Sequence, residues 1–499
     1  MFPENNKQSR NQLKTKKLIK KYSLLFVIFI FCILSFEIRV SNKTTLFKDL
    51  NNRFIEDEFF TKGNDKCDNL DPIYMMGQRF KKPPNIICKS ESSEHICYQS
   101  SKYDYYNKLY KFPNGLVCSM KNFILDPSKS LQSNLIYKGP IDRISRGSAI
   151  LSKGFFSMKC KLEKKYNKYS PLYKNYLDSW NYDENEKEME LEELSPGKTI
   201  FFISRNQDSP NLFHGSSEII NALSIMYLFN LKPEDIQIIF LESMIFKNEP
   251  FYDFYTNILS KGNKPIYIRD LSKKYFISSA IHIPVAGDSP LFMFIKSPDC
   301  QYSIKTYKLM NSLADKYLNI PIFQDSFISD NEIFYYPKKT IINHKLNTNF
   351  QKKITIQWRK VWPKGRINQQ RILGNGPELA ETLGSILPDD CLIRLVDSAS
   401  LSIQQQISIM RKTDYFIGVH GAGLALSIFM PNKSILHEIH PYKKNQLLLL
   451  MSKLSGHISY SDIVKNTIKI IDSNEYIYFD ETTFVKCVLK HMKHNRLIG

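Results

Sequence analysis

Short apolar runs alternate with amphipathic stretches in two blocks of this chain. In the first block, KTIFFIS (198–204) and IQIIFL (236–241) have the length and composition of buried strands. They flank SEIINALSIMYLFN (217–230), which has a helical pattern. A strand, a helix and a second strand in this order are typical of a parallel sheet. The first block therefore predicts the beginning of one Rossmann-like domain.

The second block repeats this alternation more clearly. Its strand candidates are KITIQW (353–358), CLIRLV (391–396), DYFIGVH (414–420) and SILHEI (434–439). Its helical stretches are GPELAETLGSIL, LSIQQQISIMRK and NQLLLLMSKLSG. Repeated βαβ units predict a second Rossmann-like domain, so we expect an α/β fold with two such domains, connected through residues 300–345.

Composition divides the whole chain further. The predicted parts are a basic cytoplasmic tail (1–21), a transmembrane signal anchor (22–40), a stem (41–65), a cysteine-bearing region (66–195), a first Rossmann-like domain (196–340), a second Rossmann-like domain (341–475) and a C-terminal segment (476–499). With 499 residues, 42% hydrophobic and 24% charged, the chain has the composition of a globular protein of several domains.

The first 40 residues indicate the anchor. Basic residues from Lys7 to Lys21 precede an uncharged apolar run from Tyr22 to Phe36. Basic flanks stay cytoplasmic, so the rest of the chain would be lumenal, in a type II orientation. The run is short for a span of ~20 residues, although snorkelling by Lys21 and Arg39 extends it. A cleaved signal peptide is the alternative, but EIRVSNKTT contains no small-x-small cleavage site, which favours the uncleaved anchor.

Cysteine usage fits a lumenal chain. Cys32 lies in the apolar run and eight cysteines follow it, five of them between residues 67 and 160. Oxidation in the lumen permits disulfides there, and an even number permits complete pairing, but the sequence does not show which cysteines pair. Asn42-Lys43-Thr44 is the expected glycosylation acceptor. Asn432-Lys433-Ser434 has the same pattern, but it lies in the glycine-rich motif described next and is not expected to be used.

That motif, GVHGAGLALSIFMPNKSILHEIHP (418–441), contains a turn between a predicted strand and a short helix. Ligands collect at the carboxyl edge of parallel strands, and free amides at a helix N-terminus suit a phosphate. Gly421 and Gly423 would let the backbone approach a diphosphate closely, and His420 could donate to one of its oxygens. The alternative is a structural turn that uses glycine for its positive φ.

Two other chemistries are disfavoured at this motif. An esterase oxyanion hole needs a nucleophile, yet no G-x-S-x-G occurs in the chain. A zinc site could use His437 and His440, but HEIH is not H-E-x-x-H, and on a strand these two positions point to opposite faces. We therefore predict no metal site.

A second stretch, WRKVWPKGRINQQRILGNGPEL (358–379), carries five basic residues. Arg359 lies at the end of a predicted strand, and Arg371 precedes Asn375 at the start of a predicted helix, where a guanidinium can fork onto phosphate oxygens. The lysines could simply be solvated. The net charge of +20 also favours anionic partners. Nucleic acid is disfavoured, because the basic domain would be lumenal and no nucleic-acid motif accompanies it.

Together these motifs resemble the family 61 glycosyltransferases. The resemblance rests on Arg359, R-I-L-x-N at 371–375, Glu378-Leu379, Val396-Asp397, Gln406, IGVHGAGL at 417–424, Phe429-Met430-Pro431 and Glu438. CSMKNFILD (118–126) and the CKLEKK and SPLYKNYLDSW segments (160–180) make the chain most similar to the EGF-domain-specific O-linked N-acetylglucosamine transferases of that family. The resemblance covers roughly residues 110–470.

The resemblance implies a GT-B architecture in which the second Rossmann-like domain holds a UDP-sugar. It further implies inverting transfer of N-acetylglucosamine, or of a pentose such as xylose, to a hydroxyl of a glycoprotein or glycan. The candidate nucleotide-sugar ligands are Arg359, Arg371, Asn375, His420, Gly421, Ala422, Gly423 and Glu438. In this scheme the arginines and amides stabilise the diphosphate, and Glu438 accepts from ribose or sugar hydroxyls. Independently of the resemblance, no D-x-D occurs, so we expect a metal-independent reaction without a cofactor.

One element departs from the family pattern. Family members carry an N-x-x-H-x-x-D-like element, whereas NLFHGSSE (211–218) has His214 but Ser217 in the place of the acid. Glu218 is adjacent but projects differently from a helix. His214 is thus a possible general base, with a capping or buried structural histidine as the alternative. Because of Ser217, a catalytically inactive lumenal binding protein with a GT-B shell is the second hypothesis.

The predicted partners are a UDP-sugar donor, a glycoprotein or glycan acceptor, and a membrane crossed once. The chain ends in RLIG rather than a KDEL-like retention signal. We therefore expect the Golgi membrane, with the endoplasmic reticulum as the second choice.

Overall fold

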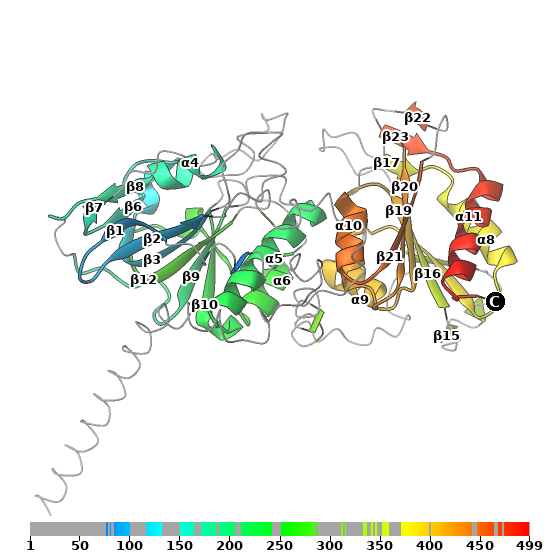
Figure 1. Ribbon diagram of the computed structural model, residues 1–499, viewed down its shortest axis with the longest axis horizontal. Coiled ribbons are helices and arrows are strands. Elements are labelled where there is room, and N and C mark those ends of the chain that lie inside the picture. Colours follow the sequence, from blue (N-terminus) through cyan, green and yellow to red (C-terminus); the bar gives the residue numbers. More distant parts are fainter. Residues whose placement is uncertain are drawn as a thin grey trace, which may run out of the picture. The chain divides into compact units, whose positions relative to one another are not determined.

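In the computed structural model, the first predicted strand–helix–strand unit lies in a ten-stranded mixed sheet (Figure 1). Strands β9 (Thr199–Ile203), β10 (Ile236–Phe240), β11 (Ile266–Tyr267) and β12 (Tyr275–Ile283) are parallel neighbours. β9 and β10 are buried almost throughout, as expected for continuous apolar runs covered on both faces. The helix between them, α5 (Leu212–Leu228), is apolar and buried nearly all round. The first predicted unit is therefore confirmed.

The cysteine-bearing region supplies the rest of this sheet. From β12 the sheet continues antiparallel through β3, β2, β1 and β7, and β6 pairs with both β3 and β8. The elements are β1 (Asn85–Lys89), β2 (Glu94–Gln99), β3 (Leu116–Leu125), β6 (Phe156–Met158), β7 (Lys161–Leu162), α4 (Pro171–Asp178) and β8 (Trp180–Tyr182). Strands from both sides of residue 195 therefore share one sheet and one hydrophobic core.

The predicted disulfides are present in this region. Cys88 pairs with Cys160, and Cys97 pairs with Cys118 on the neighbouring strand. Cys391 and Cys487 are free thiols, so the complete pairing that the even number permits is not realised.

The second predicted block forms a six-stranded sheet in the order β13-β18-β16-β19-β20-β21. Its strands are β13 (Ile333–Tyr336), β16 (Lys352–Gln357), β18 (Cys391–Val396), β19 (Tyr415–Val419), β20 (Ile435–His440) and β21 (Ile458–Ile463). All neighbours from β18 to β21 are parallel, whereas β13 is antiparallel to β18. β13 comes from the stretch that we expected to be only a connection; it adds an edge strand instead.

Helices cover both faces of this second sheet (Figure 1). α8 (Gly376–Ile386) and α11 (Glu481–His494) pack together on one face. α9 (Ile403–Arg411), η10 (Ala422–Phe429) and α10 (Leu447–Leu454) pack together on the other. A small sheet of β17 (Arg371–Leu373), β22 (Ile468–Ile471) and β23 (Asn474–Ile477) lies beside it. The chain is therefore a mixed α/β protein with parallel sheets, as predicted.

Short elements complete the described chain. They are η2 (Pro127–Lys129), β4 (Ser130–Leu131), β5 (Ile150–Leu151), η3 (Pro233–Asp235), α6 (Tyr252–Phe254), η4 (Tyr255–Leu259), η5 (Ile268–Asp270), β14 (Ile341–Ile342) and β15 (Lys345–Leu346). The structure describes residues 76–77, 80, 84–99, 116–131, 150–163, 171–185, 189–204, 211–241, 251–284, 289, 311–312, 315, 333–336, 341–342, 345–346, 352–358, 371–398, 401–441, 447–463, 468–471 and 474–498. The predicted tail, anchor and stem lie outside these residues. Within them, no helix is both long and apolar enough to span a membrane.

Candidate functional site

The glycine-rich turn lies where the parallel strands of the second sheet end. β19 ends at Val419, His420 and Gly421 form the turn, and η10 begins at Ala422. Gly421 has an extended backbone with φ 170° and ψ 169°, so the turn does not use glycine for a left-handed conformation. The alternative of a turn built on positive φ is wrong at Gly421. The turn instead places the first amides of η10 at the carboxyl edge of the sheet, where anionic ligands bind in such folds.

His420 is held from two directions. Its backbone N–H donates to the Ile439 carbonyl (2.8 Å), which ties the turn to β20. Its ring Nδ1 contacts Oε1 of Glu438, whose side chain is fully buried while the His420 side chain is 14% exposed. An ionised carboxylate can only accept a hydrogen bond, so in a pair with ionised Glu438 the ring donates through Nδ1 and Nε2 is the nitrogen left for a ligand. Glu438 thus lies behind His420, not at a position open to sugar hydroxyls.

His440 completes this group of side chains. It lies two residues after Glu438, on the same face of β20, and its ring centroid is 4.4 Å from that of His420. Burial, together with smaller effects of His420 and Arg371, lowers the pKa of His440 to about 4. His440 is therefore neutral near pH 7, and it packs against the His420 ring without adding charge.

Arg371 brings a cation to the turn from the small neighbouring sheet. Its Nη1 donates to the backbone carbonyl of His420 (3.0 Å), and its Nε lies 3.5 Å from Oε2 of the buried Glu475. These contacts orient the guanidinium while its side chain stays 37% exposed. Since arginine carries five N–H donors, donors on Nη2 are left for a ligand. Arg371 and His420 are thus brought together as predicted.

Asn375 has a different environment from the one expected of a ligand. Its Nδ2 donates to the Phe479 carbonyl (2.8 Å), and its Oδ1 accepts from the Phe479 N–H (3.1 Å). The side chain thus ties the start of α8 to the segment before α11. Asn375 therefore supports the site indirectly, because it holds together the two segments that carry Arg371 and Glu475.

His214 lies in the first turn of α5, at the carboxyl edge of the first sheet. Asn211 caps this helix, and its Oδ1 accepts from the N–H groups of Phe213 and His214. Ser217 is buried and donates to the Phe213 carbonyl (2.8 Å). Glu218 is 1% exposed and accepts from the Tyr255 hydroxyl (3.3 Å). Neither Ser217 nor Glu218 therefore presents an acid to solvent beside His214.

His437 and His440 do not converge on a common point. His437 bonds Tyr415 (3.1 Å) and Asp462 (2.7 Å), on the face that α11 covers, whereas His440 lies against His420. Elsewhere in the described chain, His95, Cys97 and Cys118 lie close enough together to share a metal ion. Their two sulfurs form a disulfide, however, and the thiolate is the form that binds metals.

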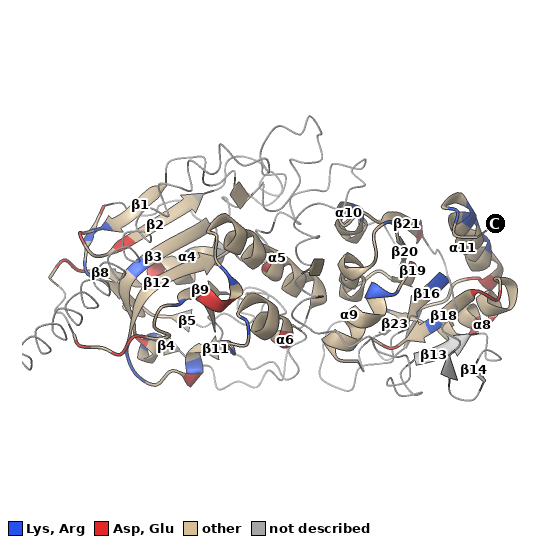
Figure 2. Cartoon of the chain, turned by 90° about the horizontal axis from the view of Figure 1, so that it is seen from below, with Lys and Arg blue, Asp and Glu red and all other residues tan. Residues whose placement is uncertain are grey.

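Two predicted site residues, Arg359 and Asn42, lie outside the described residues. Sequence reasoning missed Glu475 as a partner of Arg371, because the contact joins two short strands that are far apart in the chain. Lysines, arginines and acidic residues are interspersed around both sheets in the described part of the chain (Figure 2). This distribution does not favour the nucleic-acid alternative.

Comparison with family models identifies the region around this turn. Residues 291–436 match the model described as Glycosyltransferase 61. These residues form a glycosyltransferase family 61 domain. The family 61 domain contains Arg371, Asn375 and the His420 turn, and it ends just before Glu438. The match concerns this region and covers less than half of the chain. No curated protein matches the chain, and nothing supports the narrower resemblance to the EGF-domain-specific enzymes.

Proposed function

We propose that the chain transfers a sugar, N-acetylglucosamine or a pentose such as xylose, from a UDP-sugar to a hydroxyl of a glycoprotein or glycan. The observation that carries this proposal is the pairing of His420 with the buried Glu438 beside Arg371, at the carboxyl edge of a parallel sheet in a family 61 domain. These groups place the Arg371 cation and the His420 ring beside the amides of Ala422 and Gly423. Such a set suits a diphosphate and not a neutral ligand.

The proposed reaction is a displacement with inversion at the anomeric carbon. The acceptor oxygen forms a bond to that carbon while the bond from the carbon to the UDP oxygen breaks, and the electron pair leaves with UDP. Arg371, the η10 amides and the Nε2–H that His420 carries in its doubly protonated form would stabilise the growing charge on the diphosphate. Glu438 would hold the His420 ring so that Nε2 faces the ligand. The acceptor proton passes to a general base, for which we propose His214.

The broader setting is proposed on the same basis. The two sheets would be the two domains of a GT-B transferase, with the donor held by the second. The reaction would need no metal ion, and the chain would be a single-pass type II protein of the Golgi membrane, or else of the endoplasmic reticulum. Support for this setting comes from the missing D-x-D motif, the basic apolar N-terminus and the disulfides.

The test is a titration of the full chain with UDP and a panel of UDP-sugars, combined with an assay of sugar transfer to glycoproteins. We expect His420→Ala to weaken UDP binding by about tenfold or more, equivalent to ~1.4 kcal/mol. Glu438→Gln should weaken it less, because the ring stays but loses its orientation. His494→Ala, at the exposed end of α11, is the matched control. Unchanged UDP binding in His420→Ala would return the turn to a structural role.

A binding protein without transferase activity is the second candidate function. It is favoured by the burial of Ser217 and Glu218, because neither of them offers an accessible acid beside His214. A wild-type chain that binds a UDP-sugar but neither hydrolyses nor transfers it would support this candidate. A loss of transfer in His214→Ala, with UDP binding retained, would support the transferase instead.

A further inference from the structure

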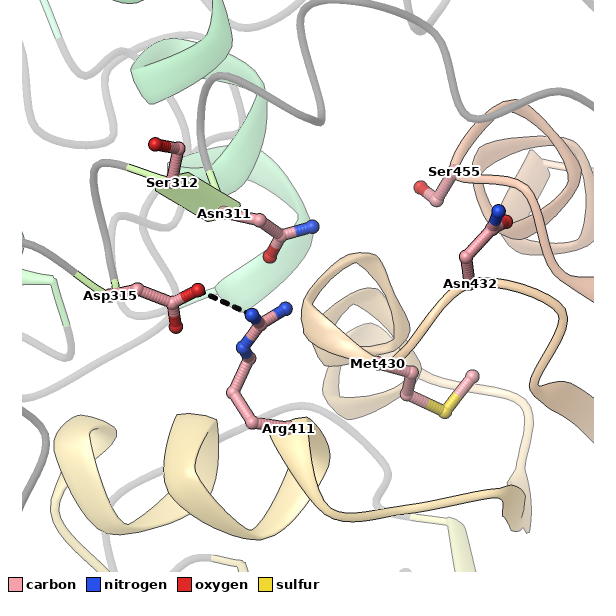
Figure 3. Close-up of a pocket in the computed structure, with 7 residues that line it drawn as sticks. All are labelled: Asn311, Ser312, Asp315, Arg411, Met430, Asn432 and Ser455. Atoms are coloured by element: carbon pink, nitrogen blue, oxygen red, sulfur yellow. Dashed lines mark hydrogen bonds and ion pairs between the residues drawn. The ribbon is translucent and has the colours of Figure 1, made fainter. Parts of the chain in front are cut away.

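A separate pocket of about 390 Å³ lies beside the second sheet (Figure 3). Its lining includes Asn311, Asp315, Arg411, Met430, Asn432 and Ser455. These side chains surround a common space in Figure 3, and they come from four separate segments of the chain. The volume is in the range of pockets that bind small ligands.

The pocket lies at the opposite edge of the sheet from the His420 turn. Arg411 is the last residue of α9, and Ser455 directly follows α10. Asn432 precedes β20 at the edge where β19, β20 and β21 begin. At ~3.3 Å per residue, the five residues of β19 place the two edges roughly 17 Å apart. A ligand in this pocket is therefore not part of the proposed diphosphate site.

The charges in the pocket compensate each other. Arg411 donates through Nη2 to Asp315, so the one cation and the one anion of the lining form an ion pair. The other polar groups are amides and hydroxyls, which both donate and accept hydrogen bonds. Met430 also belongs to the lining but is only 2% exposed, so the pocket offers a ligand mainly polar groups. This combination suits a neutral ligand with many hydroxyl groups and not a phosphate.

The side chain of Asn311 is the feature of this pocket that most directly indicates a bound ligand. Its Nδ2 donates to the Ile428 carbonyl (3.1 Å), which fixes the orientation of the amide. Its Oδ1 is buried and has no hydrogen-bond partner among the described residues. A buried acceptor without a partner is costly, and a hydroxyl of a bound ligand would supply the missing donor.

We infer that this pocket binds a small neutral saccharide, independently of the proposed donor site. The saccharide hydroxyls donate to Asn311 Oδ1 and exchange hydrogen bonds with Asn432. If the chain is a glycan-modifying transferase, the pocket holds a part of the acceptor away from the reacting hydroxyl. Saccharide binding itself does not require that function.

The experiment is a saturation-transfer NMR titration of the full chain with chitobiose, mannobiose and lactose, with and without saturating UDP. At least one disaccharide should bind, and UDP should not displace it. Asn432→Tyr should weaken this binding by about tenfold, because the exposed turn residue can place its ring in the pocket without disturbing the core. Asn311→Ala removes the buried acceptor and should also weaken disaccharide binding. His420→Ala is the control and should leave disaccharide binding unchanged.

Three results would overturn the inference. They are the absence of binding by all three disaccharides, displacement of the bound disaccharide by UDP, and wild-type affinity in both Asn432→Tyr and Asn311→Ala. Failure of the pocket and failure of the proposed function are distinguishable. A chain that binds UDP but no disaccharide loses only the pocket, whereas a chain that binds a disaccharide but no UDP-sugar loses only the donor site.

Discussion

Glu438 illustrates how one buried carboxylate can act through a neighbouring side chain. It is fully buried and contacts Nδ1 of His420, which is the more exposed of the two side chains. Burial of a charge is unfavourable unless it is paired and hydrogen-bonded, so the pairing holds the ring in one orientation. The expected role of Glu438 as a ligand of sugar hydroxyls is therefore replaced by a proposed role in positioning His420.

Asn375 allows a structural role to be separated from a binding role. Its amide makes two hydrogen bonds with the backbone of Phe479. Asn375→Ala removes both and leaves the Phe479 groups without these partners. We expect the free energy of unfolding to fall by about 1–3 kcal/mol, measured by urea denaturation. The affinity for UDP, measured by titration at a temperature where the variant is folded, should change by less than about twofold, since the contacts of His420 and Arg371 remain.

Thr382 offers a matched control on the same helix. Its exposed hydroxyl donates to Glu481 (2.9 Å), so Thr382→Ala also removes a hydrogen bond between α8 and the α11 segment. Surface changes of this kind cost within about 0.5 kcal/mol. If Asn375→Ala instead keeps its stability and loses UDP binding, Asn375 is a ligand, as the resemblance implied.

At the level of elements, the close contact between β19 and η10 supports the His420 turn. A Cβ on Gly418 would lie 2.7 Å from Leu424 Cδ2 and 3.2 Å from Gln357 Cβ. Gly418→Ala should therefore lower the free energy of unfolding by about 1–3 kcal/mol through overpacking. Leu424→Val shortens the opposing side chain, so the double variant should lose less than the sum of the two single variants in urea denaturation. Additive losses would contradict the proposed contact.

Elements with continuous apolar runs could be predicted from the sequence. β16, β18, β19 and β20 are buried strands of a parallel sheet, and their composition differs clearly from that of the amphipathic helices between them. β21 was not predicted, because ISYSDI is polar and only partly buried at the edge of the sheet. The strands of the cysteine-bearing region were also not predicted, because their place in the sheet depends on contacts between distant segments, such as the pairing of β3 with β12.

The site was predictable to a similar extent. The HGAG motif indicates a turn at the carboxyl edge of a strand, and the structure places it there. The burial of Glu438 and the contacts of Arg371 with His420 and Glu475 could not be read from the sequence. They depend on how β17, β20 and β23 come together, and no local pattern records that packing.

Across the whole molecule, cross-links and buried polar groups stabilise the first sheet together. The disulfides Cys88–Cys160 and Cys97–Cys118 close loops of 72 and 21 residues. In the chain-entropy account, closing loops of this size stabilises the folded state by about 3–4 kcal/mol each. Next to Cys97, His95 bonds the Tyr182 hydroxyl (2.8 Å), and His282 stacks on Tyr176. The core that the disulfides enclose therefore contains two histidines.

These two histidines make the folded chain sensitive to acid. Burial lowers the pKa of both His95 and His282 to about 3, and for His95 the charge of His282 adds to this effect. In the unfolded chain the same histidines take up protons near pH 6.5. The free energy of unfolding therefore decreases as the pH falls from 6.5 towards 3. Between pH 7 and pH 5, each histidine should lower the free energy of unfolding by about 2 kcal/mol, measured by urea denaturation at both values.

His282→Gln removes one titrating group and should reduce this pH dependence by that amount, whereas His494→Gln, exposed on α11, should leave it unchanged. Equal pH dependence in wild type and His282→Gln would show that the pKa of His282 is not lowered in the folded chain.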